Sequence, residues 1–167
     1  MASKAATVDR AFLLEALAEA FSGPAWHGPS LRASIKGVSA EEALWRPGED
    51  RNCIWDLVLH TAYGKYLVAS RLEPDPDRKF ARRLARAWWP RLPEPADAAA
   101  WRDDQRLLAE SHAHLVEVCS RVPAARLRAK RLRSRFTLGQ EVHGLALHDV
   151  YHAGQIRLLR RLFADAR

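Results

Sequence analysis

The chain has 167 residues, of which 48% are hydrophobic and 28% are charged. This length suits one domain with a single sizeable core, predicted over residues 1–167, and a charged fraction near the soluble-protein average of roughly 25% excludes general disorder. The 27 Lys and Arg residues exceed the 20 Asp and Glu residues, so the formal net charge is +7. Such a charge can attract nucleic acid or anionic surfaces, but it does not determine a fold.

No stretch approaches the ~18 uninterrupted apolar residues of a membrane span. Residues 1–8 lack the basic and apolar regions of a signal peptide. The two cysteines, Cys53 and Cys119, are too few for a disulfide framework and form no CxxC motif. We therefore expect a soluble, cytoplasmic protein with no membrane partner.

The N-terminal third of the chain predicts one long helix, two short helical pieces and a second long helix. Apolar side chains recur at spacings of three and four over residues 7–21, as in an amphipathic helix. A short piece follows over residues 30–36, and Ser39 opens one turn with a capping-box pattern. A strongly apolar helix is then predicted over residues 53–72, with Asn52 as its N-cap.

A long connection is predicted between the second and third main helices. Residues 73–96 hold five of the nine prolines, with one helical turn expected over residues 82–88. Trp88 and Trp89 within it either pack on the neighbouring helices or cover the mouth of a pocket. The third main helix is predicted over residues 97–122.

The C-terminal part begins with a basic segment and ends in the last main helix. Residues 124–136 lack the interleaved aromatic side chains that stack on bases, so we expect a solvated loop or short ribbon and no nucleic-acid partner. Thr137 and Gln140 form a capping box for a helix over residues 138–163. Four main helices with no competing strand pattern predict an all-α fold, a four-helix bundle.

Only one pair of the seven histidines has the spacing of a shared metal site. His148 and His152 are four residues apart, which places both imidazoles on one helix face. A catalytic-type site uses three protein ligands, and His60, in the middle of the most apolar helix, is the best third ligand. The spacing of His148 and His152 is also typical of two polar neighbours on one helix face. Likewise, His60 could be a core histidine that bonds to a neighbouring carbonyl.

Two segments carry a family resemblance: residues 52–60 (NCIWDLVLH) and residues 148–156 (HDVYHAGQI). Together they resemble the DinB-like (DinB/YfiT) superfamily, whose fold is a four-helix bundle with a three-histidine metal site. The resemblance implies that His60, His148 and His152 bind one divalent metal ion. Three neutral imidazoles suit zinc or nickel.

The resemblance also implies a function. Members with known activity include thiol S-transferases that use bacillithiol or mycothiol, and a mycothiol-dependent maleylpyruvate isomerase, in which the metal lowers the pKa of a thiol. We therefore expect a metal-dependent transferase or hydrolase that acts on a small-molecule substrate, with a low-molecular-weight thiol as a candidate partner and a homodimer as the assembly. The alternative is a non-catalytic, stress-associated protein that binds a metal or a ligand.

Four further residues are candidates for the surroundings of the metal. Asp56 lies one turn before the first predicted ligand and Glu141 two turns before the second, so each carboxylate either orients an imidazole or stays solvated. Gln155, three residues after the third ligand, either bonds near the site or makes an ordinary contact between helices. His27, in a break between helices, is a candidate for lining the pocket.

Overall fold

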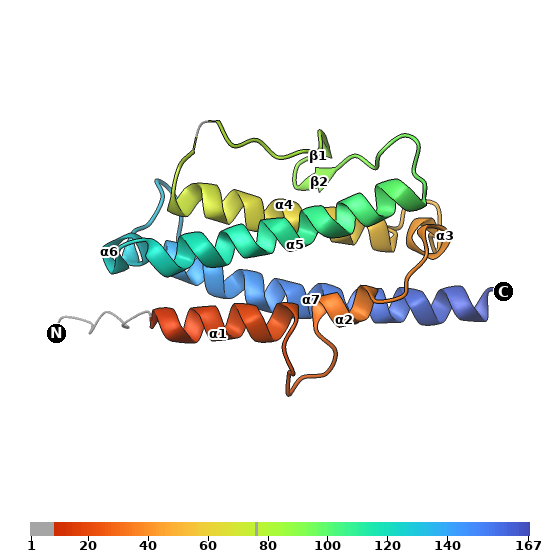
Figure 1. The fold of residues 1–167 in the computed structure, drawn as a ribbon, viewed down its shortest axis with the longest axis horizontal. Coiled ribbons are helices and arrows are strands. Elements are labelled where there is room, and N and C mark those ends of the chain that lie inside the picture. Colours follow the sequence, from red (N-terminus) through yellow and green to blue (C-terminus); the bar gives the residue numbers. More distant parts are fainter. Residues whose placement is uncertain (1–8, 76) are drawn as a thin grey trace.

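The computed structural model describes residues 9–75 and 77–167. The main helices pack as a bundle in which the first and last run in one direction and the other two run in the opposite direction (Figure 1). The predicted all-α four-helix bundle is therefore confirmed. The main helices are α1 (Arg10–Phe21), α4 (Ile54–Leu72), α5 (Ala98–Arg121) and α7 (Leu138–Asp165).

Short helices occupy the turns of the bundle, and polar N-caps start most of the helices. A cap side chain accepts a hydrogen bond from a free N–H of the first turn, which a helix cannot satisfy internally. The short helices are α2 (Leu31–Ile35), α3 (Ala40–Leu44) and α6 (Ala124–Arg128). The caps that accept such bonds are Asp9, Ser30, Ser39, Asp97 and Thr137.

One predicted helix start differs from the structure, and another lies outside the described residues. Helix α4 is capped at Cys53, so the prediction of Asn52 as N-cap is wrong: the Cys53 N–H donates to Asp56 Oδ2 at 2.9 Å, and Asn52 Oδ1 accepts from Arg86 at 3.2 Å. The predicted start of the first helix at residue 7 lies outside the described residues. None of the helices in the described part has the length and apolar content needed to cross a membrane.

The connection between α4 and α5 spans the length of the bundle because these two helices are parallel (Figure 1). It contains a two-stranded antiparallel hairpin, β1 (Leu84–Arg86) and β2 (Trp89–Pro90), that lies over α4. The helical turn predicted over residues 82–88 is therefore wrong. Local helix propensity is a weak preference that tertiary contacts override, and here the hairpin packs against side chains of α4.

The hairpin segment is tied to the bundle through one buried carboxylate. Asp104, on α5, accepts hydrogen bonds from Trp55 Nε1 and from Arg82 Nε, both at 2.8 Å. Its side chain is 1% exposed, so an unpaired charge there would be costly. Arg82, two residues before β1, satisfies that charge and holds the entrance of the hairpin on α5.

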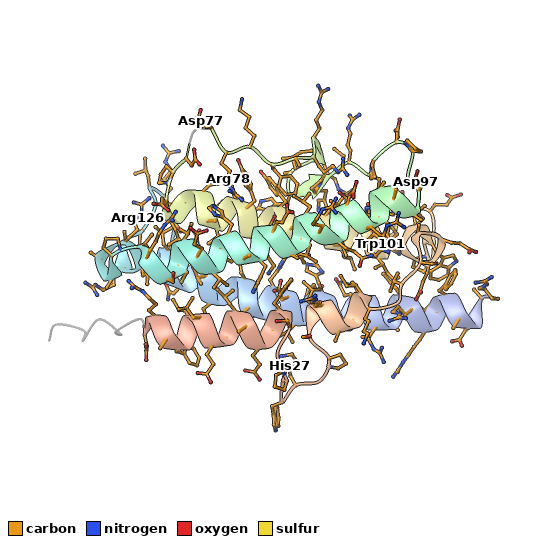
Figure 2. The ribbon with its side chains drawn as sticks, viewed as in Figure 1. His27, Asp77, Arg78, Asp97, Trp101 and Arg126 are labelled. Atoms are coloured by element: carbon orange, nitrogen blue, oxygen red, sulfur yellow. The ribbon has the colours of Figure 1, made fainter. Side chains whose placement is uncertain are left out.

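The basic segment also contributes to the structure. Arg126 donates to the carbonyl oxygens of Leu72 (2.8 Å) and Arg71 (2.6 Å) at the end of α4, where Figure 2 labels it. These carbonyls have no partner inside their helix, so the guanidinium caps them. Residues 124–128 form α6, so the expected solvated loop is wrong for the first part of the segment. The expected short ribbon is limited to one antiparallel β-bridge between Lys130 and Thr137.

A layer of buried polar residues divides the core into two apolar clusters. One cluster gathers around Trp55, Leu59 and Ile156, and the other around Leu17 and Leu115. The polar layer crosses the three helices α4, α5 and α7 between these clusters. Its buried members are His60, Thr61, Lys65, Ser111, His112, Asp149 and His152.

Candidate metal centre

Three histidines from two helices converge at one edge of the polar layer. His60 comes from α4, and His148 and His152 come from successive turns of α7. Nε2 of His148 lies 3.0 Å from Nε2 of His60 and 3.0 Å from Nε2 of His152. Each histidine offers one ring nitrogen to a group of atoms within 4.8 Å of one another, the arrangement of a metal-ligand set.

Hydrogen bonds on the far side of two rings determine which nitrogen carries the proton. His60 Nδ1 lies 2.7 Å from the carbonyl oxygen of Trp88, and His152 Nδ1 lies 2.6 Å from Oε1 of Gln155. Both partners are acceptors, so each Nδ1 must be the donor. The neutral rings of His60 and His152 then direct their Nε2 lone pairs toward Nε2 of His148, the region where a cation would be bound.

Burial keeps the three imidazoles neutral. It lowers the pKa of His148 to about 3 and that of His152 to about 4, and it lowers the pKa of His60. The cause is desolvation, which disfavours the protonated ring, and the neighbouring histidines add to it for His148 and His152. A neutral imidazole is the form that binds a metal ion, so these residues hold the ligand form at neutral pH.

The hairpin supplies the second contact of His60. Trp88 has a left-handed backbone (φ 66°) at the hairpin turn, and its carbonyl oxygen reaches the His60 ring. The Trp89 ring stacks on the His60 imidazole, with ring centroids 4.2 Å apart and an angle of 12° between the two planes. The guanidinium of Arg86 lies 5.2 Å from the Trp89 ring centre. Of the two alternatives for these tryptophans, packing on a neighbouring helix is observed: Trp89 stacks on His60, and Trp88 lies against Tyr63 with ring centroids 6.0 Å apart.

The candidate Gln155 lies beside the cluster. Besides its contact with His152, its amide nitrogen donates to the Tyr151 hydroxyl at 3.1 Å. The two contacts agree on the orientation of the amide, because its oxygen faces a ring N–H and its nitrogen faces a hydroxyl. Gln155 therefore connects a candidate ligand to the exposed surface of α7.

The two candidate carboxylates have other partners. Asp56 accepts from the Cys53 N–H and forms an ion pair with Arg46 at 2.6 Å. Glu141 pairs with Arg71 at 3.0 Å and with Arg131 at 3.2 Å, beside the basic segment. The structure thus assigns Asp56 to the start of α4 and Glu141 to the start of α7, and it brings neither to the histidine cluster.

His27 is not brought to the cluster either. It is exposed in the loop between α1 and α2, at the opposite edge of the bundle from the hairpin (Figure 2). His112 is buried on α5, where it stacks on Phe21 with ring centroids 3.8 Å apart. Its Nδ1 atom has no hydrogen-bond partner among the described residues.

A buried ion pair adjoins the cluster in the polar layer. Lys65 Nζ forms a short contact with Asp149 Oδ2, and their side chains are 0% and 1% exposed. Burial raises the pKa of Asp149, and the ammonium group of Lys65 opposes that rise. Sequence reasoning missed this pair, because only the packing of α4 against α7 brings residues 84 positions apart together.

The donor set fits a divalent metal ion. Three neutral imidazoles match the three protein ligands of a catalytic zinc site, and nickel also binds imidazole. Metal–nitrogen bonds of ~2.0–2.1 Å at tetrahedral angles separate ligand nitrogens by about 3.3 Å. The two 3.0 Å separations are close to that value, and all three ligand atoms lie within 4.8 Å of one another.

Neither cysteine offers a rival nucleophile. Burial raises the pKa of Cys53 to about 12 and also raises that of Cys119. Both thiols are free and buried, so at neutral pH they stay protonated and out of reach of a substrate. The histidine cluster is thus the candidate site that the geometry supports.

The sequence profile of the DinB superfamily matches residues 25–156. The chain belongs to the DinB superfamily. The match contains all three clustered histidines and ends at Ile156, within α7. Comparison with curated proteins and with solved structures found no match. A single domain that extends over residues 1–167 stays a prediction.

Proposed function

We propose that His60, His148 and His152 bind one divalent metal ion, zinc or nickel, and that the protein is a metal-dependent transferase or hydrolase acting on a small molecule. The observation that carries the proposal is the convergence of two Nε2 lone pairs whose orientation is set by Trp88 and Gln155. Contacts of this kind fix the tautomer of metal-ligating histidines in known sites.

The residues around the site supply orientation and a partly dry environment. A bound divalent ion lowers the pKa of a coordinated thiol or water and so supplies a nucleophile at neutral pH. Trp88 and Gln155 keep the proton of each flanking ring on Nδ1, which leaves Nε2 free to coordinate. Trp89 excludes water from one side of His60, where a lower local polarity strengthens charge interactions.

A cavity of about 330 Å³ lies between the start of α4 and the hairpin. Trp89 forms part of its wall and also stacks on His60. Arg46, Arg51 and Arg86 line it together with three carboxylates. The lining suits a small polar molecule but includes none of the three histidines, and Trp89 is the residue that connects the cavity to His60. A low-molecular-weight thiol with carboxylate and ammonium groups is the proposed co-substrate.

A second candidate function is a non-catalytic, stress-associated protein that binds a metal or a ligand. The stacking of Trp89 on His60 favours this function, because a closed site retains its metal ion without an open coordination position for a substrate. A cytoplasmic location is proposed for either function. Two free cysteines agree with a reducing compartment.

The first test is elemental analysis of protein purified without a histidine tag, with His152→Ala as the site variant and His27→Ala as the matched control. We expect about one equivalent of zinc or nickel in the wild type and in His27→Ala, and a loss of that metal in His152→Ala. If the wild type and His152→Ala both lack metal and neither takes it up on titration, the three histidines are core residues and the proposal fails.

Cobalt substitution separates the two functions. In a site with an open position, added thiol should produce a thiolate-to-cobalt charge-transfer band, and transfer of that thiol to a small electrophile should follow. A cobalt spectrum that no thiol changes, together with inactive protein, would favour the binding protein over the enzyme.

A further inference from the structure

A cavity of about 680 Å³ lies between the end of α1, helix α2 and α5. Helix α2 continues the line of α1 after the loop that joins them, and it packs on α7 (Figure 1). The three clustered histidines belong to α4 and α7 and do not line this cavity. Its volume falls in the range of roughly 300–1,000 Å³ that is typical of small-molecule sites. The cavity is thus a second candidate binding site, separate from the candidate metal centre.

Buried apolar side chains form part of the lining. They are Phe21 at the end of α1, Ile35 on α2 and Leu108 on α5. The Phe21 ring stacks on His112, with ring centroids 3.8 Å apart, and the ammonium group of Lys65 lies 5.4 Å from its centre. These contacts within the core hold the ring in place, so the apolar surface exists before any ligand binds.

Two cations of the α2 segment also line the cavity. Arg32 and Lys36 are exposed and four residues apart, a spacing that brings side chains to the same side of a helical segment. Neither forms an ion pair with another residue in the described part of the chain. Arg106 on α5 differs, because it pairs with Asp103 at 2.6 Å. Among the described residues, no Asp or Glu lines the cavity, so the lining carries a net positive charge.

This lining favours one class of ligand. The buried apolar side chains suit a ligand with an apolar body. The two cations, together with the amide of Gln105 and the hydroxyl of Ser22, are donors that suit an anionic head group. A carboxylate accepts hydrogen bonds from all of these groups. Because exposed ion pairs contribute little free energy, the apolar body must supply most of the affinity and the cations the selectivity.

We propose that this cavity binds a small amphipathic carboxylate. Its apolar body packs on Phe21 and Leu108, and its carboxylate pairs with Arg32 and Lys36. The proposal does not depend on a bound metal, because the cavity and the histidine cluster are formed by different helices. Octanoate is a suitable probe, since it combines an alkyl chain with one carboxylate.

Isothermal titration calorimetry with three probes tests the class of ligand. Octanoate should bind to the wild type, and acetate, which lacks the apolar body, should give no measurable binding. Octanol has the same chain length without the charge, and it should bind about 2- to 30-fold more weakly than octanoate, as expected for the loss of two exposed ion pairs.

Matched variants locate the site. Ala33→Trp fills the cavity from an exposed position of α2 and should abolish octanoate binding, with an unchanged circular dichroism spectrum. Ala125→Trp is its control, because Ala125 is exposed on α6, another five-residue helix, and does not line the cavity.

A double variant tests the role of the two cations. Arg32→Gln/Lys36→Gln should reduce the affinity for octanoate to that for octanol and leave the affinity for octanol unchanged. Arg128→Gln/Lys130→Gln is the control, because it removes the same net charge from two exposed residues outside the cavity.

The His152→Ala variant separates this site from the metal centre, because a carboxylate can also bind a metal ion. It should bind octanoate with the affinity of the wild type. Loss of octanoate binding in His152→Ala would assign the ligand to the metal centre and overturn the proposal. Equal affinities of the wild type for octanoate and octanol, or octanoate binding that Ala33→Trp leaves unchanged, would also overturn it.

Discussion

The Nδ1 atom of His60 lies 2.7 Å from the carbonyl oxygen of Trp88, 28 residues along the chain. This contact makes the hairpin part of the candidate metal centre, because the carbonyl keeps the proton of His60 away from the cluster. Trp88 has its left-handed backbone at this position, a conformation that costs a non-glycine residue about 1 kcal/mol or more. The packing of the hairpin on α4 compensates for that cost.

Replacement of Trp89 by alanine tests the contribution of the hairpin to metal binding. The variant loses the ring stack on His60 and exposes one side of the cluster to water. Aromatic stacks of this kind contribute roughly 0.5–1.5 kcal/mol, so the zinc dissociation constant should rise about 2- to 12-fold. Competition with a chromophoric chelator measures it. Trp26→Ala is the control, since Trp26 is 98% exposed, and its affinity should match the wild type.

Gln155 is expected to act on metal affinity through His152. Gln155→Leu removes the acceptor for the His152 Nδ1–H and should weaken zinc binding about 10- to 100-fold. Gln155→Glu keeps an acceptor oxygen and should restore most of the affinity, which a merely structural role would not explain. Equal affinities for Gln155→Leu and the control Gln105→Leu would exclude this role.

Replacements of Lys65 and Asp149 should have non-additive effects on the free energy of unfolding. Lys65→Met or Asp149→Leu alone leaves an uncompensated charge in the core and should lower the free energy of unfolding by about 3–5 kcal/mol. The double variant replaces both charges by apolar side chains and should recover most of that loss. Urea denaturation of the metal-free proteins measures all four. Additive losses in the double variant would show that the two charges do not depend on each other.

His112 should make the stability depend on pH. Burial lowers its pKa to about 3, whereas an unfolded chain has a histidine pKa near 6.5, so below pH 6.5 the unfolded state binds a proton that the folded state does not. The contribution of His112 to the free energy of unfolding is therefore fully present above pH 6.5. It is lost as the pH falls toward 3, by up to about 1.4 kcal/mol per pH unit. His112→Leu, compared with His27→Leu in metal-free protein, should show a correspondingly shallower fall in urea denaturation between pH 7 and 5. Parallel pH profiles would contradict the prediction.

Several features of the fold follow from local sequence. Thr137 and Gln140 start α7 as predicted, with hydrogen bonds in both directions (3.2 Å and 2.8 Å), because a capping box involves only residues within one turn. Asp97 likewise caps α5. The three clustered histidines were also predictable, since two of them share a helix face by spacing and the third follows from the resemblance to the family.

Other features depend on residues that are far apart in sequence. The hairpin over residues 84–90 replaces a predicted helical turn, because contacts of Trp88 and Trp89 with α4 outweigh a weak local preference. Helix periodicity made Asp56 and Glu141 candidates either to orient an imidazole or to stay solvated. Periodicity gives the face of a helix but not its neighbours, and arginines from other segments pair with both carboxylates.

Helix positions, most caps and the spacing of the histidines on α7 were readable from the chain alone, because they depend on contacts within a few residues. The packing of α4 against α7 decided the rest: it brings His60 to the pair on α7 and joins Lys65 to Asp149. These relationships join residues more than 80 positions apart, and no local pattern encodes which faces of two helices will meet.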